Sequence, residues 1–132
     1  MNEYKIYSEM TKRFVNEYGV DFIIPTNTAL QYARETALKG EYNLVRDDRH
    51  LCLGVARYIA ASMWFQTLIS PVFNVGLKSI TANHIVTAEE INAVKAIYGS
   101  SADVGATDVT DNNRALCQEC VLKASVNMYI PS

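Results

Sequence analysis

The sequence has no excess of charge of one sign and few cysteines. Its 132 residues contain 12 Lys and Arg against 14 Asp and Glu, which gives a formal net charge of -2. Nucleic-acid binding needs a basic patch that neutralises phosphates, and because none is visible we expect no nucleic-acid partner. The three cysteines are an odd number, and they are too few for a disulfide framework in a chain of this length.

A long hydrophobic run is also lacking. The longest apolar stretch, residues 51–72, is interrupted by Arg57 and Gln66, which favours a buried helix over a membrane span. The first residues are polar and carry no signal-peptide pattern. We therefore expect no membrane partner.

What is present is a strongly helical pattern in a chain that is 49% hydrophobic, enough for one globular core. Thr87-Ala88-Glu89-Glu90 has the pattern of a capping box, and Thr110 or Asp111 offers a cap for the last helix. Pro71 is expected to end the long third helix. Apolar periodicity and these signals predict about five helices, over residues 3–18, 26–38, 51–69, 88–98 and 111–128.

Strands are scarce in this pattern. Val20–Ile24 reads as a short buried strand, and residues 42–45 are a possible second extended piece. A lone buried strand leaves its backbone donors and acceptors unpaired, which is costly. Either the partners of Val20–Ile24 lie in another polypeptide or the segment is not a strand.

Asp47 and His50 are the strongest candidates for catalytic residues, three positions apart where a loop is predicted to enter the third helix. In acyl transfer to water, histidine accepts the proton of an attacking serine because its pKa lies near neutrality. A carboxylate on the other ring nitrogen fixes the tautomer and stabilises the imidazolium. The alternative is that Asp47 or Asp48 only caps the helix.

The pair is followed by Leu51, by Gly54 and by the run Arg57-Tyr58-Ile59-Ala60-Ala61. Asp47-x-x-His50-Leu51 together with these residues resembles the last motif block of the SGNH (GDSL-type) hydrolases. In that family the block supplies the catalytic Asp and His and leads into the final long helix. Residues 18–25 look like the last core strand of the family. The tail, residues 87–128, is similar to C-terminal extensions in a bacterial subgroup of unknown function.

The resemblance implies an α/β ancestry, the C-terminal part of a three-layer α/β/α fold, although this chain itself is mostly helical. It implies a serine esterase for small acyl esters or acetylated carbohydrates, with no cofactor and no metal. His50 would be the base and Asp47 its orienting carboxylate. Position 48 is Asp where the family often has Gly, so whether Asp47 or Asp48 pairs with His50 stays open.

The nucleophile of such an enzyme is missing from these residues. The family carries its serine in a Gly-Asp-Ser block, and the sequence has neither this nor Gly-x-Ser-x-Gly. We expect the isolated chain to be inactive. It should pair with a missing N-terminal SGNH segment or self-associate through the strand Val20–Ile24. Localisation stays open, and it would be periplasmic or secreted if the parent enzyme has an upstream signal peptide.

The chain is predicted to form a single or partial domain, with an SGNH-like segment over residues 1–72 and a helical extension over 73–132. Cys117 and Cys120 have C-x-x-C spacing but fall inside the last predicted helix, so two small buried side chains are the simpler interpretation. A second hypothesis for function is a non-catalytic helical interaction module in which Asp47 and His50 are helix-capping residues.

Overall fold

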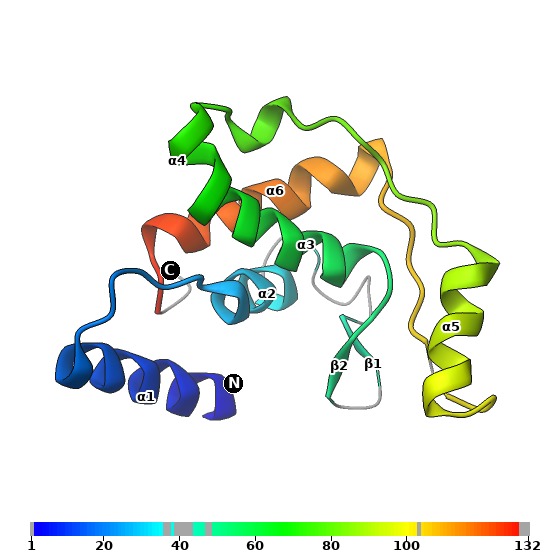
Figure 1. The fold of residues 1–132 in the computed structure, drawn as a ribbon, viewed down its shortest axis with the longest axis horizontal. Helices are drawn as coiled ribbons and strands as arrows, with labels where there is room; N and C mark the ends of the chain where they lie inside the picture. Colours follow the sequence, from blue (N-terminus) through cyan, green and yellow to red (C-terminus); the bar gives the residue numbers. More distant parts are fainter. Residues whose placement is uncertain (1, 36–37, 39–43, 47–48, 103, 130–132) are drawn as a thin grey trace.

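The protein is mostly helical, with one short antiparallel hairpin (Figure 1). The computed structural model describes residues 2–35, 38, 44–46, 49–102 and 104–129. The helical class predicted from the sequence is confirmed. In chain order the elements are α1 (Asn2–Tyr18), α2 (Thr26–Glu35), β1 (Val45–Arg46), β2 (His50–Leu51), α3 (Val55–Trp64), a π-helical turn η1 (Phe65–Ile69), α4 (Ser70–Phe73), a 3-10 turn η2 (Leu77–Ser79), α5 (Ala88–Tyr98) and α6 (Asp111–Val126).

The main core lies between α2, α3 and α6, which pack against one another in the centre of the molecule (Figure 1). Burial of large apolar side chains from all three helices is the dominant stabilising contribution of this core. The last helix belongs to the segment predicted as an extension, yet it supplies a full face of the core. The fully buried side chains include Tyr32, Ile59, Met63, Cys117 and Val121.

Helix α5 stands apart from this core on one side of the molecule (Figure 1). A second, smaller cluster joins it to the body, formed by Leu53, Val94 and Val104 with Val86 and Ile91 at its edge. The chain returns from α5 along residues 104–109, which hydrogen-bond to Leu53 and Val55 on one side and to His84 on the other. Few apolar contacts therefore fix the position of α5.

Helix α1 lies at the opposite side and is held by polar contacts. The Tyr4 hydroxyl lies 2.9 Å from Oγ1 of Thr28 in α2 and donates to the carbonyl of Tyr129. Ser8 donates to the same carbonyl. The rest of its apolar stripe faces outward, between 55 and 65% exposed, and consists of Ile6, Tyr7, Met10, Phe14 and Tyr18.

The predicted strand Val20–Ile24 is wrong. The segment is an irregular connection between α1 and α2, begun by Gly19 at φ 63° after the last turn of α1. Val20 is 39% and Phe22 is 62% exposed. The physical reason is that no described strand lies beside this segment to complete a ladder of hydrogen bonds.

The third helix also differs from the prediction. Leu51 belongs to β2, and α3 begins at Val55. Pro71 does not end the helical run but lies in the first turn of α4. The π-helical turn η1 precedes it, and this wider turn accommodates a proline that would otherwise clash with the carbonyl four residues earlier. The run ends at Asn74, which adopts the left-handed conformation.

The two predicted helix starts after residue 86 are confirmed. Thr87 and Glu90 form a reciprocal capping box at the start of α5. Thr110 and Asn113 form the equivalent pair at the start of α6. The second helix was predicted to reach about residue 38, and α2 ends at Glu35 with residues 36–37 outside the described part. Among the described helices, none is both long and apolar enough to span a bilayer.

Candidate functional site

The hairpin places His50 on one face together with Arg46. Strands β1 and β2 are antiparallel, and Arg46 pairs directly with His50. Residues directly opposite in an antiparallel pair project to the same side. The carboxylates predicted to orient His50, Asp47 and Asp48, lie outside the described residues.

His50 does not lie at a helix start, contrary to the prediction. The N-cap of α3 is Gly54, which provides no side-chain cap. Hydrogen bonds fix this junction, because Thr107 donates its N–H to the Leu53 carbonyl at 3.1 Å and accepts from the Val55 N–H at 3.1 Å. A capping role for His50 on α3 is therefore wrong. The imidazole is half-buried and belongs to the hairpin.

Tyr98, the last residue of α5, contacts both hairpin side chains. Its ring centroid lies 4.9 Å from that of His50, with the planes inclined by 50°. The guanidinium carbon of Arg46 lies 4.6 Å from the same Tyr98 centroid. Arg46 is 1% exposed, so this cation–π contact lies in a largely desolvated environment. Tyr98 thereby joins α5 to the candidate site.

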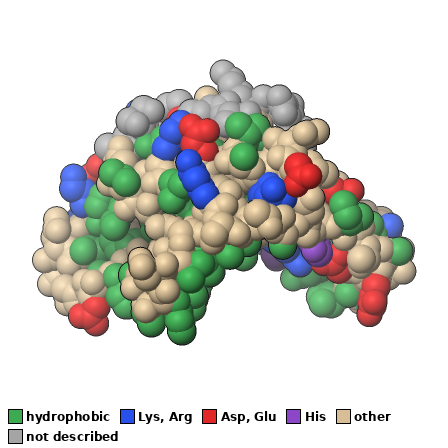
Figure 2. Space-filling model, turned by 90° about the horizontal axis from the view of Figure 1, so that it is seen from above, with side chains coloured by type: hydrophobic (Ala, Val, Ile, Leu, Met, Phe, Trp, Pro, Cys, Tyr) green, Lys and Arg blue, Asp and Glu red, His purple; other side chains and the backbone are tan. Residues whose placement is uncertain are grey.

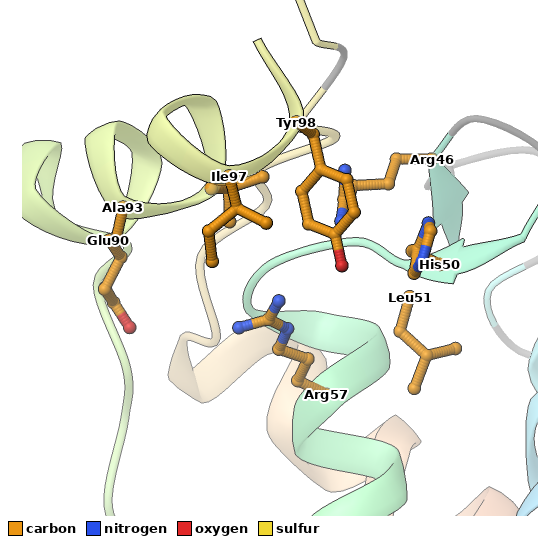
Figure 3. Close-up of a pocket in the computed structure, with 9 residues that line it drawn as sticks. Arg46, His50, Leu51, Arg57, Glu90, Ala93, Ile97 and Tyr98 are labelled. Carbon is orange, nitrogen blue, oxygen red and sulfur yellow. The ribbon is translucent and has the colours of Figure 1, made fainter.

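A pocket of about 480 Å³ opens where the hairpin, α3 and α5 meet (Figure 3). Arg57, in the first turn of α3, points toward the space below Ile97 and Tyr98, and the Tyr98 hydroxyl points toward the same space. In the space-filling view the surface is hollowed between the helical body and α5, with histidine atoms visible at its edge (Figure 2). The described lining residues are Arg46, His50, Leu51, Arg57, Glu90, Ala93, Val94, Ile97 and Tyr98.

The one carboxylate among these described lining residues is already engaged. Glu90 accepts from the Thr87 N–H at 2.8 Å and lies 3.0 Å from Nε2 of His84. The hydrogen bond from the Thr87 backbone is the main cause that lowers the pKa of Glu90, and His84 adds to it. His84 thus belongs to the α5 cap and lies about half-exposed. The other described lining residues are two arginines, a histidine, a tyrosine and four aliphatic side chains.

The buried thiols lie in the core and not in this pocket. Cys52, Cys117 and Cys120 are each at most 1% exposed. Burial raises the pKa of Cys117 to about 12, with a further contribution from neighbouring Cys120. A thiol with such a pKa is a poor nucleophile and a poor metal ligand at neutral pH. In the described ranges, no group of three or more His, Cys, Asp or Glu side chains is placed to hold a metal ion.

Two residues of the site were not singled out by the sequence as functional. Tyr98 is part of the apolar periodicity of its helix, and Arg57 belongs to the motif resemblance without a role of its own. Nothing in the local pattern connects Tyr98 to His50, because the contact depends on where α5 docks. Arg57 carries a weak signal, a charge that interrupts an otherwise apolar helix.

The fold and the pocket define a helical domain that presents a histidine from a short hairpin to a cavity. A comparison with family models matches residues 1–100 to the Domain of unknown function (DUF4886). The match covers more than half of the 132 residues, and the chain belongs to this family. Neither the curated proteins nor the solved structures gave a match.

Proposed function

We propose that this chain is the C-terminal segment of an SGNH-type serine hydrolase, an enzyme like a carboxylesterase or acetylesterase. The substrate would be a small acyl ester or an acetylated carbohydrate. The observation that carries the proposal is the position of His50, half-buried on the hairpin with its side chain lining a pocket. The motif resemblance adds support, because it assigns the catalytic base to this same residue.

The chemistry assigned to His50 is general base and then general acid catalysis. The imidazole accepts the proton of a serine hydroxyl as that oxygen attacks the ester carbonyl. It returns the proton to the leaving alcohol when the tetrahedral intermediate collapses. Asp47 is proposed to hold the other ring nitrogen and to stabilise the imidazolium. Tyr98, in contact with the imidazole, restricts the orientation of the ring.

The serine and its oxyanion donors are proposed to come from an N-terminal SGNH segment. The exposed stripe of α1 supports such a partner, because a row of large apolar side chains in water is unfavourable and commonly marks an interface. Phe22, 62% exposed in the connection after α1, extends this apolar surface along the chain.

A second candidate function is a non-catalytic helical interaction module. The same exposed stripe of α1 favours it, because an amphipathic helix that lays its apolar face in a groove is a common mode of recognition. In this candidate function His50 does not cap a helix, because the residue lies in β2. The two candidates differ in whether His50 matters for catalysis.

The first test uses the isolated chain and the coding region upstream of Met1. With short p-nitrophenyl esters, we expect the chain to hydrolyse no faster than its His50→Ala variant, because no nucleophile is assigned within it. The upstream region is expected to encode an in-frame Gly-Asp-Ser block. A clear His50-dependent rate from the chain alone would show that its serine has been overlooked. An upstream region without that block would overturn the proposed parent enzyme.

A further inference from the structure

Helix α1 is attached to the body of the molecule mainly through two side chains in its first half. Tyr4 and Ser8 are 7% and 8% exposed, whereas Val15 is half-buried and the other α1 side chains with a described burial are exposed. Apart from the bond that ends the helix at Gly19, Tyr4 and Ser8 make the only hydrogen bonds between α1 and the rest of the described chain. What these two hydroxyl groups bind therefore decides where α1 lies.

Both hydroxyl groups bind the backbone of residues 127–129, which follow α6 and are called the strap. Tyr4 and Ser8 donate to the carbonyl of Tyr129, and Thr28 of α2 donates to the carbonyl of Met128. Figure 1 shows the chain descending from the end of α6 toward α1. The strap is thus hydrogen-bonded to both α1 and α2 and joins the two helices.

The three hydroxyl groups and the two carbonyls form a polar latch. In the closed arrangement the hydroxyls of Tyr4, Ser8 and Thr28 each donate to a carbonyl. When α1 moves away, the same groups bond to water, and this exchange of hydrogen bonds has a small net cost. A cavity of about 90 Å³, lined by these three residues among others, gives water room beside the latch. The latch therefore opens without leaving a polar group unpaired in the core.

The other end of α1 leads into a connection with the properties of a hinge, residues 19–24. Gly19 has a φ of 63°, and a Cβ at this position would meet no atom within 4 Å. Residues 20–23 make no backbone–backbone hydrogen bond within the described part of the chain. Backbone without such bonds reorients at low cost, so these residues allow α1 to move as a unit.

The sequence of α1 supports a helix that keeps its form away from the body. Lys5, Glu9, Arg13 and Glu17 follow one another at four-residue spacing with alternating charge. Opposite charges at this spacing stabilise an isolated helix. With 17 residues, α1 is also longer than the helices that are marginal in water by length alone.

We propose that α1 is a hinged arm, which the strap latches beside α2. When the bonds from Tyr4 and Ser8 to the Tyr129 carbonyl break, α1 turns about residues 19–24 and keeps its helical form. The latch thereby sets the direction in which the apolar stripe of α1 faces a partner. The device rests on the contacts of α1 and the strap, and it does not depend on the proposed hydrolase activity.

The test is a pulsed electron resonance measurement of the distance between spin labels on Asn16→Cys in α1 and Asn112→Cys in α6, both exposed positions. The native cysteines are at most 1% exposed, so the labels attach to the introduced ones. Excess unlabelled protein ensures that only distances within one chain contribute. With the latch intact we expect a single narrow distance distribution, and a broad one would overturn the proposal.

Variants of the labelled protein assign the effect to the latch. Tyr4→Phe combined with Ser8→Ala removes both donors of α1 and should broaden the distribution about twofold or more. Tyr7→Phe is the matched control, because it removes the same hydroxyl from a tyrosine that is 61% exposed, and it should leave the distribution unchanged. A distribution that stays narrow in the double variant, or that broadens equally in the control, would overturn the latch.

Circular dichroism of the same variants separates a turning helix from an unfolding one. The double variant should keep the helix content of the wild type, because α1 retains its own backbone hydrogen bonds. Broadening together with a loss of helix would show that α1 melts, and it would overturn the hinge. None of these results bears on His50, so the proposed function and the latch stand or fall separately.

Discussion

Gly54 is the residue on which the junction between hairpin and α3 depends. Its φ of 80° lies in the region that favours glycine. A Cβ at this position would lie 1.8 Å from the Thr107 carbonyl oxygen. The same carbonyl accepts the hydrogen bond of Val55 that starts the helix. The backbone on both sides would have to move to accommodate any side chain.

We therefore expect Gly54→Ala to lower the free energy of unfolding by about 2 kcal/mol or more, from backbone strain and the collision together. Gly76→Ala is the matched control, because nothing lies within 4 Å of its Cβ position and its φ is -70°. The control should be neutral or slightly stabilising. Chemical denaturation of both variants gives the comparison, and equal stability would contradict the geometry at Gly54.

The raised pKa of Cys117 makes the free energy of unfolding depend on pH. The folded thiol stays protonated up to about pH 12, whereas an unfolded one ionises near 9.0. Between these values the unfolded state binds fewer protons than the folded state, so stability falls as pH rises. Below pH 9 both forms are protonated and the contribution is fully present.

Unfolding of the wild type should therefore become easier between pH 9 and 12, and less steeply so for Cys117→Ala. The measurement is the denaturation midpoint at several pH values for both proteins. Other groups titrate in this range, but those that do not interact with Cys117 are shared and cancel in the difference. Parallel pH profiles would contradict the assignment of the raised pKa to Cys117.

At the scale of elements, the capping box of α5 is linked to the pocket, because α5 carries Tyr98. Thr87 accepts from the Glu90 N–H at 3.2 Å, and Glu90 accepts from the Thr87 N–H at 2.8 Å. Thr87→Ala should destabilise the helix by about 1 kcal/mol. Since α5 is joined to the body by a small cluster, we expect faster hydrogen exchange in α5 and little change in α6. Uniform acceleration in both helices would contradict this local effect.

Much of the element pattern could be predicted from the sequence because its signals are local. The capping box at Thr87 and the cap offered by Thr110 or Asp111 indicate two helix starts, and both are found in the structure. The prediction of a strand at Val20–Ile24 is wrong because an apolar run of that length forms a strand only when a neighbouring strand completes its hydrogen bonds. The prediction that Pro71 ends the third helix is wrong because the π-helical turn before it has no clear signature in the local sequence.

The candidate site was only partly predictable for a related reason. Motif resemblance singled out His50 and Asp47, but it could not place His50 in a hairpin. The contacts of Tyr98 with His50 and Arg46 join segments far apart in the chain. Such contacts depend on how α5 docks through Leu53, Val94 and Val104, which no local pattern encodes.

At the scale of the whole molecule, the exposed apolar stripe of α1 has a consequence in solution. We expect the isolated chain to self-associate in a concentration-dependent way, because these side chains gain by leaving water. Phe14→Glu should shift the protein toward monomer, and Lys12→Glu, on the same helix outside the stripe, should not. Size-exclusion chromatography with light scattering measures both. A monodisperse wild-type monomer would favour the self-contained interaction module.

The proposed role of His50 is measured most directly in the protein encoded together with its upstream region. Its kcat/KM for a short acyl ester is compared among wild type, His50→Ala and His84→Ala. If His50 is the general base, its loss should lower kcat/KM by about 10²–10⁴-fold. His84→Ala should stay near wild type, because His84 pairs with the α5 cap. A His50→Ala enzyme as active as the wild type would show that His50 is not the general base.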